Sequence, residues 1–191
     1  LNKKKVNFTK IQKRAKPAVK TLDITIDEFR RILQFETRHK RLSLARDLFL
    51  LSFYLGGINL IDIMQNDFSG EEIRYIRNKT ANKREGDKVV TFAIQKEAKN
   101  IIRKYIAKNG KLNFGYNYSY RNFQRYLNFC LKRLKEVLNI KSNVSFYSAR
   151  KTFSQFAFDL GVRTEIVEYC LGQSMKDNRP IYNYVRVMQR Q

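Results

Sequence analysis

The chain has 191 residues, which is enough for one domain with a substantial hydrophobic core. It carries 39 lysines and arginines against 17 aspartates and glutamates, a formal net charge of +22, together with 14 phenylalanines and 11 tyrosines. So many apolar side chains exclude a disordered tail, and repulsion within so basic a chain favours a polyanionic partner, namely nucleic acid. An anionic membrane surface is the weaker alternative, because the basic residues are spread along the whole chain.

Disulfide-rich, metal-binding, secreted and membrane-spanning proteins are excluded by features that the sequence lacks. Cys130 and Cys170 stand among apolar residues at helical spacing, so we expect both in the core and neither in a disulfide or a metal site. The start of the sequence has no apolar run typical of a signal peptide, and the run from 48 to 58 is shorter than the roughly 20 residues that span a bilayer. We therefore expect a cytoplasmic protein. Because the sequence begins at Leu1 without methionine, we expect a fragment that lacks an upstream domain.

Residues 1–20 are basic and show little periodicity, which predicts a linker or arm ahead of a single domain at 21–191. This segment either lies along a phosphate backbone or is an ordinary solvated tail. Thr25 and Glu28 form a capping box, and the apolar residues that follow predict a helix from about 25 to 36.

The segment 43–55 is apolar nearly all round, which predicts a helix buried at the centre of the domain and ended by Gly56-Gly57. His39 lies between the first two helices without catalytic partners nearby, so we interpret it as structural. Asp62 is expected to cap the short helix that comes next.

Segments 73–77 and 88–94 are rich in β-forming residues and predict a hairpin of a small antiparallel sheet. Helical periodicity resumes at 98–106 and at 119–138. The loop between these helices holds several aromatic residues that either anchor it to the core, which we favour, or stack on bases: Phe114, Tyr116, Tyr118 and Tyr120. The predicted fold class is a mainly α domain with a small antiparallel β-sheet (α+β).

The stretch 144–184 has the most specific pattern. It contains Ser-Ala-Arg-Lys-Thr-Phe around Arg150, Leu-Gly-Gln-Ser around Gln173 and Ile-Tyr at Tyr182. Gly161 follows Arg150 by 11 residues, Gln173 follows Arg150 by 23, and Tyr182 follows Gln173 by 9. This order and spacing resemble the catalytic domain of tyrosine recombinases (the phage integrase family).

The resemblance extends from about residue 22 to residue 187. Gly57 and Asp62 match the glycine and the aspartate of the first family box, and Lys79 falls where related recombinases carry a hairpin lysine. The Lys-Thr pair in the hairpin and Tyr147 look most similar to integrases of mobile elements in Bacteroides-like bacteria.

The resemblance implies cleavage and rejoining of double-stranded DNA through a 3′-phosphotyrosine, without a metal or other cofactor. Tyr182 would be the nucleophile, chosen over Tyr184 by its spacing from Gln173. Arg150 would bind the scissile phosphate, since a guanidinium can contact two phosphate oxygens at once. Lys79 would protonate the leaving 5′-oxygen.

Three further catalytic positions depart from the residues usual in the family. Tyr147 stands where histidine or lysine is common, Gln173 where histidine or tryptophan is common, and Asn59 where an arginine is expected. Each side chain can still donate a hydrogen bond but brings no charge, so we expect an impaired enzyme. Lys151, next to Arg150, would supply some of the missing positive charge.

The remaining expected DNA contacts are basic residues near the hairpin and on the helix at 119–138: Arg77, Lys83, Arg84, Arg121 and Arg125. In the resembled family such domains work as tetramers on DNA, and the isolated domain is expected to be a homo-oligomer or a monomer. Two alternatives stay open: a catalytically degenerate relative that only binds DNA, and a basic RNA-binding protein.

Overall fold

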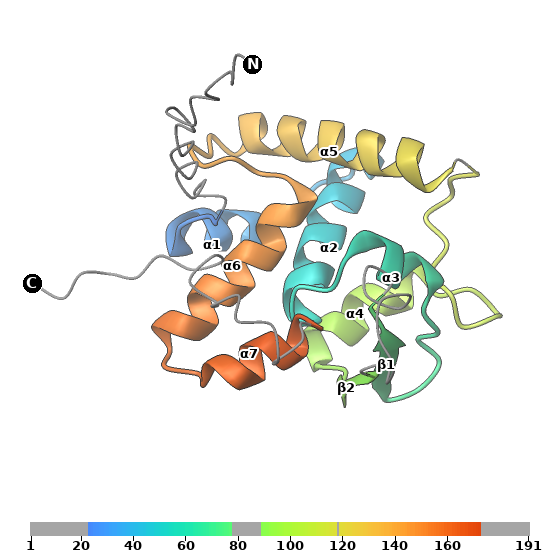
Figure 1. Cartoon of the computed structure of the whole chain (residues 1–191). Coiled ribbons are helices and arrows are strands. Elements are labelled where there is room, and N and C mark those ends of the chain that lie inside the picture. The colour runs from blue at the N-terminus through green and yellow to red at the C-terminus, as the bar shows by residue number, and fades with distance from the viewer. Residues whose placement is uncertain (1–22, 78–88, 118, 173–191) are drawn as a thin grey trace, which may run out of the picture.

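The computed structural model describes residues 23–77, 89–117 and 119–172. This part of the chain is mainly helical, with one small antiparallel sheet, as the sequence predicts (Figure 1). The elements are α1 (Ile26–Gln34), α2 (Lys40–Tyr54), α3 (Leu60–Gln65), β1 (Glu72–Ile76), β2 (Val89–Ala93), α4 (Lys96–Tyr105), α5 (Tyr120–Val137), α6 (Phe146–Asp159) and α7 (Thr164–Cys170).

Helix α2 forms the centre of the domain and packs against α4, α5 and α6. Its apolar residues from Leu42 to Leu51 are buried on all sides and Phe53 and Tyr54 are partly buried, which confirms the predicted central helix. Two buried polar side chains in α2 have partners: Asp47 accepts hydrogen bonds from Lys104 and Tyr105, and the Ser52 hydroxyl donates to the carbonyl of Ile58 at 2.8 Å. Ser52 thereby fixes the turn that follows α2.

The predicted capping box begins α1. Thr25 Oγ1 accepts a hydrogen bond from the Glu28 amide at 3.2 Å, and Glu28 Oε2 accepts one from the Thr25 amide at 3.0 Å. Glu28 Oε1 also accepts from the backbone amides of Lys141 and Ser142, at 2.8 and 3.0 Å. Burial opposes ionisation of Glu28, but the hydrogen bonds from Ser142, Thr25 and Lys141 outweigh burial and lower its pKa to about 2.

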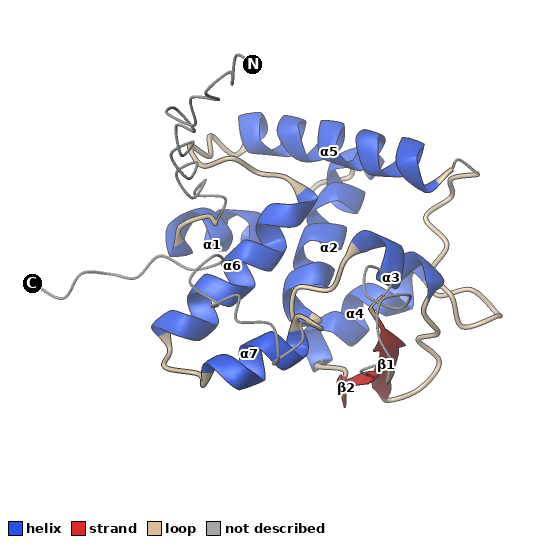
Figure 2. Ribbon diagram, viewed as in Figure 1, coloured by secondary structure: helices blue, strands red, loops and turns tan. Residues whose placement is uncertain are grey.

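The predicted hairpin strands pair as β1 and β2, with Ile73 opposite Phe92 and Tyr75 opposite Val90 (Figure 2). Ile73, Tyr75 and Val90 are buried, so this face of the sheet covers the helical core. Lys79, Lys83 and Arg84 belong to the connection at 78–88, which lies outside the described residues.

The aromatic loop before α5 is anchored to the core, as we favoured. The ring of Phe114 stacks on Phe123, with centroids 5.5 Å apart and an interplanar angle of 6°, and Tyr116 contacts Tyr126 with centroids 4.4 Å apart. Tyr120 begins α5 and packs against the same core, whereas Tyr118 lies outside the described part of the chain.

Two sequence predictions were wrong in detail. Asn59, not Asp62, occupies the N-cap position of α3, and Asp62 is buried inside the helix. Cys130 is buried as expected, but Cys170 is only half-buried, because it lies at the end of α7 near the surface. His39 is exposed directly before α2. None of the described helices is both long and apolar enough to cross a membrane.

Candidate active site

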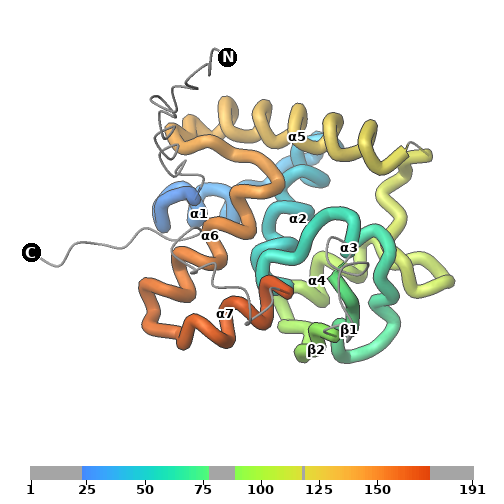
Figure 3. The backbone as a smooth tube through the Cα atoms, viewed as in Figure 1, coloured from blue at the N-terminus to red at the C-terminus, as the bar shows by residue number. Residues whose placement is uncertain are grey.

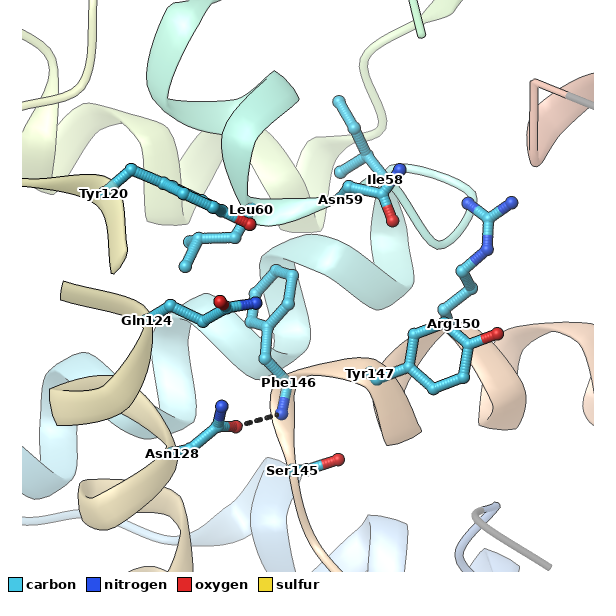
Figure 4. Close-up of a pocket in the computed structure, with 10 residues that line it drawn as sticks. All are labelled: Ile58, Asn59, Leu60, Tyr120, Gln124, Asn128, Ser145, Phe146, Tyr147 and Arg150. Carbon is cyan, nitrogen blue, oxygen red and sulfur yellow. Dashed lines mark hydrogen bonds between the residues drawn. The ribbon is translucent and has the colours of Figure 1, made fainter. Parts of the chain in front are cut away.

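A pocket of about 110 Å³ opens where three parts of the chain meet (Figure 4). The turn after α2 and the start of α3 form one wall, one face of α5 forms a second, and the first turns of α6 form the third. The lining residues are Ile58, Asn59, Leu60, Tyr120, Gln124, Asn128, Ser145, Phe146, Tyr147 and Arg150.

The start of α6 is fixed by its own cap and by α5. Ser145 Oγ accepts a hydrogen bond from the Ser148 amide at 3.3 Å, and Ser148 Oγ accepts one from the Ser145 amide at 2.7 Å. Asn128 Oδ1 on α5 accepts from the Phe146 amide at 2.9 Å (Figure 4). Because capping satisfies amides that a helix leaves without partners, these bonds set where α6 begins and hence where Tyr147 and Arg150 lie.

Arg150 joins two segments that are far apart in the sequence. Its Nη1 donates to the carbonyl of Gly57 at 2.8 Å, and its Nη2 donates to the carbonyl of Leu171 at 2.6 Å. The residue is only 2% exposed and still lines the pocket. Two bonds to fixed carbonyls set the plane of the guanidinium, whose fork matches a pair of phosphate oxygens.

Two glycines make the close packing around these contacts possible. At Gly57 (φ +76°) a Cβ would lie 3.0 Å from Arg150 Cγ, and at Gly172 (φ +60°) it would lie 3.2 Å from both Cβ and Cδ of Arg77. Arg77 is buried just beyond the end of β1. Arg77 and Arg150 thus flank the same turn, 171–172.

Tyr75 lies beside this turn and donates its hydroxyl hydrogen to the carbonyl of Cys170 at 3.3 Å. Burial raises the pKa of Tyr75 far above its usual value, although the nearby positive charge of Arg150 acts in the opposite direction. The phenol therefore stays protonated at neutral pH and serves as a hydrogen-bond donor, not as a nucleophile.

Asn59 and Asp62 form the base of the wall at α3. Asn59 Nδ2 donates to Asp62 Oδ2 at 3.2 Å, and Asp62 is only 4% exposed. Tyr120 approaches from α5, and its pKa is raised by burial and by the charge of Asp62. At the position where the resembled family has an arginine, the pocket thus presents a neutral amide held by a buried carboxylate.

The structure brings together three of the six predicted catalytic residues. Asn59, Tyr147 and Arg150 line one pocket, and Tyr147 is 42% exposed beside it. The other three, Lys79, Gln173 and Tyr182, lie outside the described residues. Among the predicted DNA contacts, Arg121 and Arg125 are exposed on α5, whereas Arg77 and Lys151 are buried and do not belong to the exposed basic surface.

Sequence analysis did not place α5 at this pocket. Tyr120, Gln124 and Asn128 recur every four residues and share one face of the helix, a signal that is visible in the sequence. That this face meets the start of α6 was not visible, since the bond from Phe146 to Asn128 depends on how the helices pack.

Comparisons place this architecture among known folds. No protein-family model and no curated protein matches the sequence. The structure is similar to the XerH site-specific recombinase bound to difH substrate in a pre-cleavage complex (TM-score 0.56, 15% identity, 87% of this chain and 51% of that chain). It is also similar to XerA recombinase (TM-score 0.55, 13% identity, 84% of this chain and 57% of that chain). A third similar structure is the Tn1549 transposon integrase in complex with transposon right end DNA (TM-score 0.52, 12% identity, 80% of this chain and 58% of that chain).

The chain therefore spans little more than half the length of these proteins. At such low identity the similarity establishes the architecture and not the activity. The mostly helical domain with its small antiparallel sheet has the fold of tyrosine recombinase catalytic domains.

Proposed function

We propose that this chain is the catalytic domain of a tyrosine recombinase that breaks and rejoins double-stranded DNA. The observation that carries the proposal is the position of Arg150, which backbone carbonyls hold at the wall of a pocket that Asn59 and Tyr147 also line. The fold and the net charge of +22 support it.

The proposed reaction is a transfer of a phosphoryl group between two oxygens. The Tyr182 hydroxyl oxygen forms a bond to phosphorus, its proton passes to a base, and the bond from phosphorus to the 5′-oxygen breaks. Lys79 gives a proton to that leaving oxygen, so the products are a 3′-phosphotyrosine and a free 5′-hydroxyl. Because a phenol has a pKa of about 10 and is a weak nucleophile, the pocket has to stabilise the charge of the transition state.

The described side chains differ in how they could stabilise the charge of the transition state. Arg150 contributes a positive charge, while Tyr147 contributes a hydroxyl and Asn59 an amide. Loss of one transition-state donor lowers a rate by about 10² to 10³. With Asn59, and with Gln173 beyond the described residues, we propose a slow enzyme.

The proposal also covers the sub-family, the cellular location and the assembly of the protein. We propose that the chain belongs with integrases of Bacteroides-type mobile elements, acts in the cytoplasm and assembles as a homo-oligomer on DNA. The structures of XerH and of the Tn1549 integrase with DNA support a DNA substrate.

The second candidate is a recombinase relative that binds DNA without cleaving it. It is favoured by one observation: the amide of Asn59 is bonded to Asp62, so the first family box contributes no cation to the pocket. An adduct assay separates the two candidates.

The assay uses a duplex nicked beside the scissile phosphate, so that the 5′ fragment diffuses away and the covalent protein–DNA complex accumulates. We expect a band of protein–DNA adduct in a denaturing gel, lost in Tyr182→Phe and kept in the matched variant Tyr184→Phe. DNA affinity should be nearly equal in all three proteins, because one hydroxyl contributes little to a charge-driven contact. If the natural sequence forms no adduct on a verified cognate site, the binding-only candidate replaces the enzyme.

A further inference from the structure

A second cavity, of about 340 Å³, lies beside the pocket. Its walls are the C-terminal half of α5 and the segment 143–145. Figure 3 shows that the chain passes back along α5 before it enters α6. We call this cavity the lysine groove, after Lys132 and Lys135.

The lysine groove adjoins the pocket. Asn128 and Ser145 line both cavities, and Asn128 accepts the hydrogen bond from the Phe146 amide between them. A ligand chain that binds beside Arg150 and continues past Asn128 would therefore reach the groove.

The groove carries a net positive charge. Lys132 is exposed, and Lys135 is half-buried with its Nζ donating to the carbonyl of Lys141 at 3.2 Å. One carboxylate, that of Glu136, also lines the groove, but Arg133 forms an ion pair with it at 2.9 Å. Since a carbonyl leaves the charge of Lys135 intact, both lysines remain available to an anion.

The spacing of the charges fits a nucleic acid backbone. An α-helix rises 1.5 Å per residue, so Lys132 lies about 6 Å and Lys135 about 10 Å beyond Asn128 along the axis of α5. Each strand of B-DNA carries one charge per roughly 3.4 Å of axis. For a duplex with its axis parallel to α5, this length would cover about two or three phosphates.

We propose that the lysine groove binds the DNA backbone next to the scissile phosphate, with Lys132 and Lys135 each contacting one phosphate. This proposal rests on the proposed function, because the strand is placed by its phosphate at Arg150. An acidic protein segment is the competing ligand class. The groove favours DNA because it shares a wall, at Asn128 and Ser145, with the pocket that Arg150 lines.

The test compares two variants with equal loss of charge. Lys132→Gln/Lys135→Gln changes the groove, and Lys96→Gln/Lys108→Gln changes two exposed lysines that line neither cavity. Binding of a fluorescent duplex is measured by anisotropy at several salt concentrations, and thermal unfolding verifies that both variants fold. The slope of log K against log salt should become shallower by about 1.8 in the groove variant, since each lost phosphate contact removes about 0.9. The control variant should change far less.

Each outcome decides one of the two proposals. Equal slopes for the groove and control variants would overturn the role of the groove, while adduct formation by the natural sequence would leave the proposed function standing. A groove variant that loses affinity for a labelled polyglutamate peptide but not for DNA would assign the groove to an acidic protein instead. Salt-independent DNA binding by the natural sequence would refute the proposed function and, with it, this inference.

Discussion

Gly57→Ala tests whether the turn after α2 holds Arg150 in place. Gly57 has φ +76°, and an added Cβ would lie 3.0 Å from Arg150 Cγ, 3.1 Å from Arg150 Cα and 3.2 Å from Leu171 Cδ2. The substitution therefore introduces both backbone strain and a steric clash. Gly115 has a similar φ of +72° with no atom within 4 Å of an added Cβ, so Gly115→Ala introduces the strain alone.

The two substitutions should differ by the cost of the clash. Left-handed backbone costs an L-residue about 1 to 2 kcal/mol, and forcing a methyl group into a packed region costs about 1 to 3 kcal/mol more. We expect the free energy of unfolding to fall by about 1 to 2 kcal/mol in Gly115→Ala and by about 2 to 5 kcal/mol in Gly57→Ala. In addition, the clash should displace the guanidinium of Arg150 from the Gly57 carbonyl that it contacts at 2.8 Å.

Urea unfolding gives the stabilities, and the nicked duplex gives the adduct yield. We expect Gly57→Ala to lower the rate of adduct formation about tenfold or more, measured where the variant is still folded, whereas Gly115→Ala keeps the natural rate. Equal loss of stability in the two variants, with an unchanged adduct rate in Gly57→Ala, would show that the contact between Gly57 and Arg150 has no such role.

Two more predictions concern Glu28 and Asn59. The pKa of Glu28 is lowered to about 2 from 4.5, so its stabilisation, on the order of 3 kcal/mol, should be present above about pH 4.5 and be lost as the pH falls toward 2. Urea midpoints between pH 3 and 7 should show this loss, which Glu28→Gln should remove and the exposed neighbour variant Asp27→Asn should not. Asn59→Arg should raise the adduct yield about tenfold or more, because it adds a cation beside Arg150; an unchanged yield on a cognate site would mean that charge at position 59 is not limiting.

Local patterns predicted much of the fold because their physical causes are local. The capping box of Thr25 and Glu28 and the apolar helix at 43–55 depend on residues within one or two turns, and both are present in the structure. Of the two interpretations of Asp62, a cap and the structural role that the resemblance implies, the cap was wrong because an acidic residue near a helix start suits either the N-cap or the first turn, and only the backbone shows that Asn59 is the cap.

The candidate site depended instead on contacts between distant segments. Spacing singled out Arg150, but nothing in the sequence indicates that its guanidinium donates to carbonyls 93 and 21 residues away. The polar face of α5 was likewise visible only as a pattern, until packing against α6 gave it a pocket to line. The resemblance predicted the order of the candidate residues along the chain, and the structure showed which of them lie close together.

The way Arg150 is held bears on how its guanidinium is oriented at the pocket. The carbonyls of Gly57 and Leu171 each accept a hydrogen bond from the guanidinium, and a carbonyl orients a cation without a formal negative charge of its own. Asp62, the nearby buried carboxylate, bonds to the amide of Asn59. The two carbonyl bonds thus set the plane of the guanidinium at the wall of the pocket, which is the orientation that the proposed contact with a phosphate requires.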